Sequence, residues 1–450
     1  MKKNIKKIVA IGIGLNVMSG SIIPAFAADT LKRTENINTQ IINDESSSII
    51  NGQAINNKPV LTLDQVINAA INSNEDLTLK SQQISMYRKK ESLQDKTNDF
   101  YESLGEKIYD FPYDKLELLE KQTNQSKDFL QDQIANDITN KYNAIIIKQV
   151  DISQSKTNLE IKNKDLETIK TKVEIGMATL NQLTDKQIEI NSLKNDVAAK
   201  ENSLKDSMDY LGVLTNLNLS NYTLDSSIKY DVFKIDGSID EYIDDKSDLY
   251  LKYNQKLIDL TKDYLDDLKD DGVKDIMDKD VPSMPSGAIP SASSYMKTDD
   301  ATGVTELDEG AYSIGLSTYA LQLINYEKNA LEYYMDLTKY GSYLDGKYGL
   351  EEAQVKLDNS KKSLKNGLKQ AYSTLLDLEN KINDLNETIQ STNTKLSYAK
   401  TQVDIGMMTE NNYNSLVLKS EQLNTSLRTL INAYNNLKTT IQEPWILSSN

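Results

Sequence analysis

The chain of 450 residues contains no cysteine and no histidine. Without cysteine it can form no disulfide, carry no lipid on an N-terminal cysteine and perform no thiol chemistry. Without histidine it lacks the commonest general base and the commonest metal ligand of proteins. We therefore expect no cofactor and no metal site, and an enzyme is the least favoured class of function.

Proline and long hydrophobic runs are scarce as well. Only seven prolines occur, whereas charged residues make up 26% of the chain. This composition is typical of long solvated helices. Beyond the N-terminal region, no segment has the ~20 consecutive apolar residues that a membrane helix needs. The formal net charge of −16 argues against nucleic-acid binding, because nucleic acid requires a basic surface.

The first 27 residues have the pattern of a secretory signal peptide. Four lysines precede a short apolar core from Ile8 to Leu15, and Ala25-Phe26-Ala27 forms an A-x-A cleavage site. We expect an exported protein that acts in the cell envelope or outside the cell. Residues 28–57 are rich in Asn, Ser and Thr without periodicity, which predicts a flexible leader.

One stretch occurs twice, 230 residues apart. Its copies run from Thr171 to Asn181 and from Thr401 to Asn411, and seven of the eleven positions are identical. In each copy a glycine, Gly176 or Gly406, interrupts a helical pattern, and glycine readily adopts the positive φ that ends a helix. A threonine follows three residues later, and its hydroxyl can cap the next helix. The pattern predicts two helical hairpins with these stretches at their tips.

Apolar residues spaced by seven flank both tips. Upstream, two rows of six coincide under the same offset: Ile138, Ile145, Ile152, Leu159, Leu166 and Val173, and Leu368, Leu375, Ile382, Ile389, Leu396 and Val403. Downstream, the return rows are Leu183, Ile190, Val197, Leu204 and Leu211, and Leu416, Leu423, Leu430 and Leu437. A seven-residue apolar repeat is typical of coiled-coil packing. We predict an all-α fold of two tandem repeats of long antiparallel coiled-coil helical hairpins.

Breaks in this pattern predict the domain organisation. We expect a signal peptide (1–27), the leader (28–57), a first hairpin repeat (58–215), a connector (216–237), a second hairpin repeat (238–442) and a tail (443–450). The second repeat contains a loop insertion at about 271–320, where prolines and serines gather.

Local signals predict individual elements. Thr62 and Gln65 form a capping box that opens a helix running to about residue 107. Phe111-Pro112 then breaks the pattern, and a helix follows from about Tyr113 to Glu174. Its return partner ends near Leu214. Short strands are expected at Tyr230 to Phe233 and at Tyr312 to Leu316, and the glycines at 341, 346 and 349 are expected to loosen the join to the next helix.

The two tips and the opening helix resemble the TolC family of efflux and secretion channels. Ile175-Gly176-Met177-Ala178-Thr179 and Ile405-Gly406-Met407-Met408-Thr409 are similar to that family's repeated V-G-L-x-[ST] tip. The stretch from Leu61 through Leu77 is similar to the family's first helix, although Glu75 stands where a proline is usual. The resemblance covers nearly all of the chain after the signal peptide.

This resemblance implies an assembly and a set of partners. In the family, three chains form a helical tunnel that a β-barrel plants in the outer membrane, and the tips meet a membrane-fusion adaptor or pump. By resemblance the partner-binding residues are Ile175, Gly176, Met177, Thr179, Ile405, Gly406, Met407 and Thr409. The chain departs from the family between Lys107 and Tyr113, which is too short for two membrane strands of about 9–11 residues. The β-barrel strands are therefore expected to be largely missing, and the exported protein is expected not to be embedded in an outer membrane.

Other interpretations of particular residues remain open. The acidic run from Asp263 to Asp280 could bind Ca²⁺, but Lys269 interrupts an EF-hand pattern, so a solvated surface is favoured. Tyrosines 333, 334, 340, 343 and 348 could stack on cell-wall sugars or pack at helix interfaces. For the whole chain, the alternative to a transport component is a structural or adhesive coiled-coil protein of the envelope.

Overall fold

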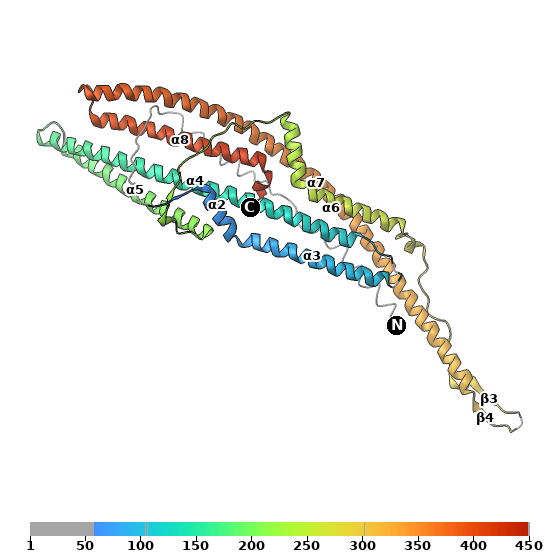
Figure 1. The fold of residues 1–450 in the computed structure, drawn as a ribbon. Coiled ribbons are helices and arrows are strands. Elements are labelled where there is room, and N and C mark those ends of the chain that lie inside the picture. The colour runs from blue at the N-terminus through green and yellow to red at the C-terminus, as the bar shows by residue number, and fades with distance from the viewer. Residues whose placement is uncertain (1–57, 104, 106, 301, 449–450) are drawn as a thin grey trace. The chain divides into compact units, whose positions relative to one another are not determined.

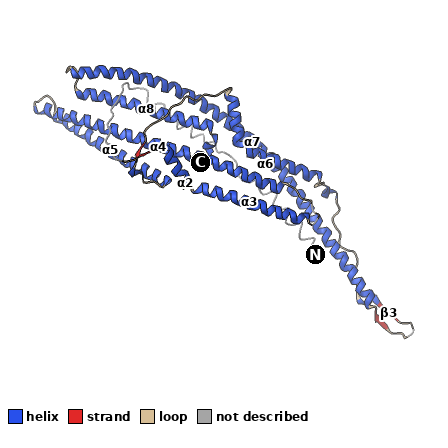
Figure 2. Cartoon of the chain, in the orientation of Figure 1, coloured by secondary structure: helices blue, strands red, loops and turns tan. Residues whose placement is uncertain are grey.

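The computed structural model describes residues 58–103, 105, 107–300 and 302–448. Long helices make up most of them (Figures 1 and 2), which confirms the predicted all-α fold. The α-helices are α2 (Leu63–Ser73), α3 (Glu75–Glu102), α4 (Phe111–Glu174), α5 (Leu180–Thr215), α6 (Ile239–Asp270), α7 (Glu309–Asp404) and α8 (Glu410–Gln442). The predicted signal peptide and leader lie outside the described residues.

Within the described residues, four short strands form two small sheets. Strands β1 (Val60–Leu61) and β2 (Thr223–Leu224) pair in parallel, and β3 (Met296–Thr298) and β4 (Thr305–Leu307) pair antiparallel. The described part of the chain contains no helix that is both long and apolar enough to cross a membrane.

The described residues divide into two compact units. Unit 1 contains residues 87–119 and 253–359, and unit 2 contains residues 58–86, 120–252 and 360–448. Because α3, α4, α6 and α7 each continue from one unit into the other, every unit is built from segments far apart in sequence. Both predicted tips belong to unit 2.

The first hairpin of unit 2 pairs α4 with α5 (Figure 1). Its predicted rows face inward: Ile138, Ile145, Ile152, Leu166, Ile190, Val197 and Leu211 are buried. Leu159 and Val173 are half-buried. Charged pairs border the seam, among them Lys156 with Glu201 at 2.7 Å and Lys162 with Glu189 at 3.1 Å. The seven-residue repeat therefore forms the interface that it predicts.

The second hairpin pairs α7 with α8 in the same way. Its core cluster contains Leu375, Ile382, Leu430, Tyr434 and Leu437, with Ile382 and Tyr434 fully buried. The hairpins also contact each other through polar side chains. The Gln154 amide donates to the Thr425 hydroxyl at 2.8 Å, and the Asn411 amide donates to Asp165 at 2.5 Å. Unit 2 is thus two paired helical hairpins joined side by side.

The opening helix is shorter than predicted. The capping box of Thr62 and Gln65 is present, and Val66 and Ala70 are buried. The prediction of one helix to residue 107 is wrong, because α2 ends at Ser73. The Asn74 side chain then accepts the backbone N–H of Leu77 at 3.0 Å, which caps a new helix. The apolar pattern continues through Asn74, so periodicity alone does not show this break.

The connector contains a strand, but not at the predicted place. Strand β2 lies at Thr223–Leu224, and the Tyr142 hydroxyl donates to the carbonyls of Leu61 and Asp225, both at 2.9 Å. Tyr230 and Phe233, predicted to be in a strand, instead pack against the core cluster of α7 and α8. The Phe233 N–H donates to the Tyr434 hydroxyl at 2.7 Å, so a side chain satisfies it in place of a strand partner.

Unit 1 holds the remaining differences from the sequence predictions. The predicted strand from Tyr312 to Leu316 is the start of α7, because Asp308 accepts the N–H of Ala311 at 2.9 Å and caps this helix. The glycines at 341, 346 and 349 do not interrupt α7. A single glycine costs a helix only about 1 kcal/mol, and packing of α7 side chains such as Tyr343 can offset this.

The expected break at Phe111-Pro112 lies just before these residues, since α4 begins at Phe111 and includes Pro112 in its first turn. Proline in the first turn of a helix removes no intrahelical hydrogen bond. Helix α3 ends at Glu102, so only residues 103–110 separate α3 from α4. Between α6 and α7 the chain forms the short 3-10 turns Asp275–Asp278 and Ala292–Tyr295 and the β3–β4 sheet.

We predict that the buried rows carry the stability of unit 2. Ile382 is fully buried and Ile152 is 7% exposed. Changing either to Asp places a charge in an apolar seam and should lower the free energy of unfolding by several kcal/mol. Ile188→Asp is the control, because Ile188 is 62% exposed on α5. Urea unfolding followed by circular dichroism measures the difference, and equal midpoints for all three variants would contradict the buried seams.

Candidate functional site at the hairpin tips

Both hairpins turn through the same backbone motif. At the end of α4 the N–H of Met177 donates to the carbonyl of Lys172 at 2.7 Å, and that of Gly176 donates to Val173 at 3.0 Å. At the end of α7 the N–H of Met407 donates to Gln402 at 2.8 Å, and that of Gly406 donates to Val403 at 2.9 Å. This pair of bonds defines the Schellman motif, which satisfies the last carbonyls of a helix.

The motif requires a positive φ at the residue after the helix. Gly176 has φ +76° and Gly406 has φ +74°, and no heavy atom lies within 4 Å of a Cβ built on either residue. Backbone conformation, and not lack of space, therefore requires glycine at both positions. Gly367, in the interior of α7, also has open space around it but no positive φ.

The two threonines cap the return helices as predicted. Thr179 and Gln182 form a capping box, in which the Thr179 hydroxyl accepts the Gln182 N–H at 3.3 Å and the Gln182 side chain accepts the Thr179 N–H at 2.9 Å. The Thr409 hydroxyl accepts the Asn412 N–H at 3.2 Å. Each tip is thus closed on both sides by local hydrogen bonds, which fixes the direction of the side chains between them.

Large apolar side chains at the tips are exposed. Met177 is 73% exposed and Met407 is 78% exposed, while Ile175 and Ile405 are each 62% exposed. Leu180, which the sequence analysis did not select, is 70% exposed beside the first tip. Its position in the sequence could have revealed this. Leu180 lies in the first turn of the return helix, and the apolar row of that helix begins at Leu183, so Leu180 is outside the row. Apolar groups held on a fixed turn can bind the apolar surface of a partner.

A shallow depression of about 490 Å³ lies next to the first tip, between the ends of α4 and α5. Met177, Lys172 and Glu189 contribute to its lining. Glu189 accepts hydrogen bonds from Lys186 and Lys162, which lower the pKa of its carboxyl below the usual range. The first tip therefore combines exposed apolar groups with charged side chains that already pair with one another.

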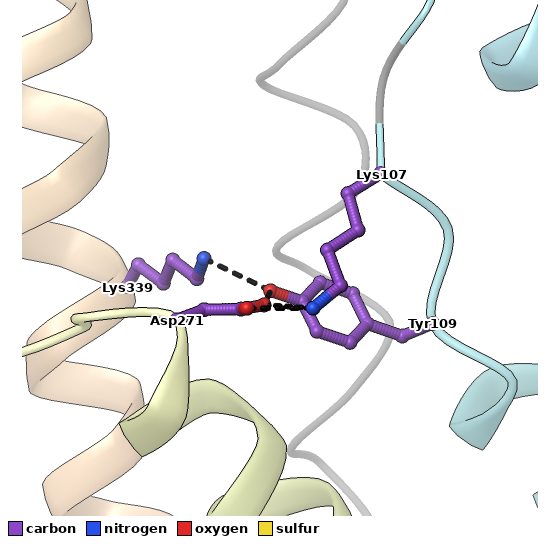
Figure 3. Close-up of polar contacts among 4 residues, drawn as sticks. All are labelled: Lys107, Tyr109, Asp271 and Lys339. Carbon is purple, nitrogen blue, oxygen red and sulfur yellow. Dashed lines mark hydrogen bonds and ion pairs between the residues drawn. The ribbon is translucent and has the colours of Figure 1, made fainter.

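Asp271, one residue of the acidic run of unit 1, belongs to a different network. Asp271 accepts hydrogen bonds from the Lys107 ammonium at 2.6 Å and from the Tyr109 hydroxyl at 2.5 Å (Figure 3). Lys339, on α7, donates to the same hydroxyl at 3.4 Å. These contacts join three segments that are far apart in sequence. Asp271 thus links the segment between α3 and α4 to the end of α6.

Burial and hydrogen bonding shift the titration of this network. Burial raises the pKa of the Tyr109 hydroxyl well above its ordinary value, and the hydrogen bond to Asp271 adds to the shift. The hydrogen bond from Lys107, and then the one from Tyr109, lower the pKa of Asp271.

Nearby in unit 1, burial lowers the pKa of Lys115 to about 8. Tyr264 lies between the rings of Tyr109, at 5.5 Å edge-on, and Phe111, at 4.2 Å stacked.

The tyrosines of α7 fall into two groups. Tyr343 is buried in a cluster with Leu265 and Leu268, and Tyr340 stacks on it with ring centroids 6.2 Å apart. Tyr334 and Tyr348 are 66% and 70% exposed. The structure therefore brings some of them into the core and leaves others on the surface, and they do not form one aromatic platform.

We predict opposite effects for alanine at two kinds of glycine. Gly176→Ala and Gly406→Ala should each destabilise unit 2 by about 1–2 kcal/mol, because the new Cβ strains a left-handed residue. Gly367→Ala should instead stabilise by up to about 1 kcal/mol, since alanine is the better helix former. Thermal unfolding of the three variants compares them. Equal destabilisation by all three variants would contradict the claim that the positive φ is what requires glycine at the tips.

The Asp271 network predicts a pH dependence. Because the pKa of folded Asp271 is lower than the value of about 3.9 in an unfolded chain, its charged form stabilises the fold above about pH 4. This contribution is lost as the pH falls through the folded pKa. Asp271→Asn should therefore lower the melting temperature at pH 7, and the difference from the unchanged protein should shrink below pH 4. Asp270→Asn is the control. A difference in melting temperature between Asp271→Asn and the unchanged protein that stays constant with pH would contradict the role of the Asp271 charge.

Comparison with known proteins supports the fold. No family profile matches the sequence, and no curated protein matches it either. Among solved structures, CusC aligns with a TM-score of 0.50 at 9% identity, over 89% of this chain and 96% of its own. The CusC structures concern conformational changes that accompany folding and transmembrane channel formation. The CmeC outer membrane channel of Campylobacter jejuni aligns with a TM-score of 0.50 at 11% identity, over 86% of both chains.

A membrane protein from Pseudomonas aeruginosa gives the same TM-score of 0.50 at 9% identity, covering 86% of this chain and 93% of its own. At such low identities the likeness concerns the fold, and it extends over most of each chain. The resemblance to the TolC family that the two tips suggested is thus confirmed at the level of structure: the chain has the helical fold of the outer membrane efflux channels.

Proposed function

We propose that this protein is a TolC-like efflux or secretion component of the cell envelope. In this proposal it is a helical conduit or scaffold that docks on a pump or membrane-fusion adaptor through its hairpin tips. It works by binding and not by catalysis. The fold that it shares with CusC and the CmeC channel supports this class of function over a purely structural or adhesive one.

The observation that carries the proposal is the pair of matching tips. Each presents a methionine that is more than 70% exposed, immediately after a glycine that ends a long helix. The buried rows do not need these methionines, because Val173 and Val403 already end the rows inside the helices. Methionine is flexible and polarizable, which suits an adaptable contact with another helical surface.

Both tips lie at the same end of unit 2, so that they can contact one partner together (Figure 1). The bonds between Asn411 and Asp165 and between Gln154 and Thr425 hold the two hairpins side by side behind the tips. A partner would therefore meet two apolar contacts in a fixed relation. Simultaneous engagement of two sites strengthens binding beyond that of either alone.

The remaining parts of the proposal come from the sequence and from the family resemblance. The pattern of the first 27 residues supports export by a signal peptide, and the short segment between Lys107 and Tyr113 supports a place in the envelope or outside the cell without embedding in an outer membrane. The family resemblance supports a homo-oligomer, a trimer. Its cargo would pass along, or be organised by, the helical assembly.

We predict that Met177→Glu with Met407→Glu abolishes capture of the partner. Both side chains are exposed, so helix content and melting temperature should stay unchanged, while two desolvated carboxylates should oppose binding. The measurement is a pull-down from the producing cell with mass spectrometry, scored on whether a pump or adaptor protein is recovered.

A matched control separates the site from the charge change. Met277→Glu with Met284→Glu alters two methionines that are 65% and 66% exposed in unit 1, and it should leave capture intact. Equal capture by the tip variant and the control would remove the docking role and favour a structural coiled-coil protein. Loss of folding in the tip variant would show that the methionines belong to the core.

A further inference from the structure

One face of α3 carries apolar side chains at the spacing of a coiled-coil seam, but they are exposed. Leu79, Met86, Leu93 and Phe100 follow one another at intervals of seven residues, and their exposed fractions are 59%, 39%, 64% and 52%. We call these residues the α3 row. The opposite side of the helix is buried at Leu77 and Ile84. Helix α3 thus packs on its own chain along one side and presents a second seam on another.

Helix α7 carries a second exposed row within unit 1. Tyr334, Gly341, Tyr348 and Val355 recur at intervals of seven, and Leu337 and Leu344 stand between them at the second position of a heptad. The five apolar side chains are 40–70% exposed. We call these six residues the α7 row. Gly341, with no heavy atom within 4 Å of an added Cβ, forms a notch in it.

These rows have the same seven-residue spacing as the seams described above, but they are exposed. Rows of the same period on α4, α5, α7 and α8 are buried against a neighbouring helix. A seven-residue apolar repeat stays on one side of a helix only when that helix winds about another. Leu93 and Phe100 of the α3 row lie in unit 1 together with the α7 row, and their side chains are exposed, so these parts of the two rows do not cover each other within one chain.

Charge makes the two rows complementary. From Lys80 to Lys96, α3 carries five basic and two acidic residues, although the chain as a whole is acidic. From Glu327 to Asp358, α7 carries seven acidic and four basic residues. Lys89 and Lys96 stand three residues after Met86 and Leu93, and Glu351 takes the position that Leu337 and Leu344 hold in the α7 row, while Lys90, Asp345 and Glu352 lie beside the rows. Opposite charges beside an apolar seam favour pairing of unlike helices and disfavour pairing of like ones.

We propose that the α3 row of one copy of this chain packs against the α7 row of a second copy. The inference rests on the proposed homo-oligomer and names the surfaces that build it. An interface between two different surfaces of the same chain is heterologous, so that each added copy presents a new α3 row and a new α7 row. Such contacts close into a ring when the rotation between copies permits. A ring of this kind is what a conduit requires.

Cysteine cross-linking tests this pairing directly, because the chain has no cysteine of its own. Full-length chains carrying Leu93→Cys are mixed with chains carrying Tyr334→Cys, Tyr348→Cys or Val355→Cys and are then oxidised. Three partner positions are used because both rows repeat every seven residues. A shift of one helix by seven residues along the other therefore still brings the rows into contact, but places Leu93 opposite a different residue of the α7 row. We expect a disulfide-linked dimer in at least one mixture and none with either variant alone. Ile188→Cys, equally exposed on α5, replaces Leu93→Cys in the control mixture.

A chain with both cysteines of the productive pair should give a ladder of linked oligomers, whose largest member counts the copies in a closed ring. Reversal of the flanking charges on one row, Lys89→Glu with Lys90→Glu, should reduce linkage. Added Glu351→Lys with Glu352→Lys on the partner should restore it.

Three results would overturn the pairing: a disulfide within one chain, linkage only between identical variants, or no linkage above the control. If linkage is absent while tip-dependent capture of the partner persists, the pairing is wrong and the docking proposal survives. The reverse result would remove docking and keep the pairing.

Discussion

The fold depends on the burial of one narrow apolar stripe along very long helices. A helix of 64 residues, such as α4, can keep one side against a partner over its whole length only if its apolar residues recur every seven positions. The rows through Ile152 and Ile382 meet this requirement, and they leave most of each helix surface to charged residues. Unit 2 is held by these seams, by the cluster around Tyr434 and by a few polar contacts between hairpins.

The tips follow from the same constraint. An antiparallel seam needs a reversal of the chain that keeps the rows of both helices in register, and the Schellman motif followed by a capping threonine supplies one within a few residues. Because local hydrogen bonds close the turn, Ile175, Met177, Ile405 and Met407 are not needed for packing and are exposed. The surface that can engage a partner is therefore a consequence of how the hairpin is built.

The sequence predicted best what is local or periodic. Glycine and threonine at the tips, the capping box at Thr62 and the buried rows could all be recognised because each depends on neighbours within a few turns. The break at Asn74 and the start of α7 at Asp308 were missed, since a side-chain cap overrode the surrounding pattern at each. Strand β2 depends on pairing with β1 and on Tyr142, contacts that no local signal contains. Periodicity also cannot distinguish a buried row from an exposed one. Leu93 and Ile152 each belong to a row of apolar residues spaced by seven, and only the structure shows that Leu93 is exposed while Ile152 is buried.

The central claim is that two hairpins in one compact unit hold their tips in a fixed relation. The distance between spin labels on Met177→Cys and Met407→Cys in the otherwise cysteine-free chain tests it most directly. The account predicts a single narrow distance distribution, which should broaden when Asp165→Ala and Gln154→Ala remove the contacts between the hairpins. With labelled chains diluted in unlabelled ones, so that only distances within one copy are measured, a broad or two-peaked distribution in the unchanged background would show that the hairpins move independently and would contradict the account.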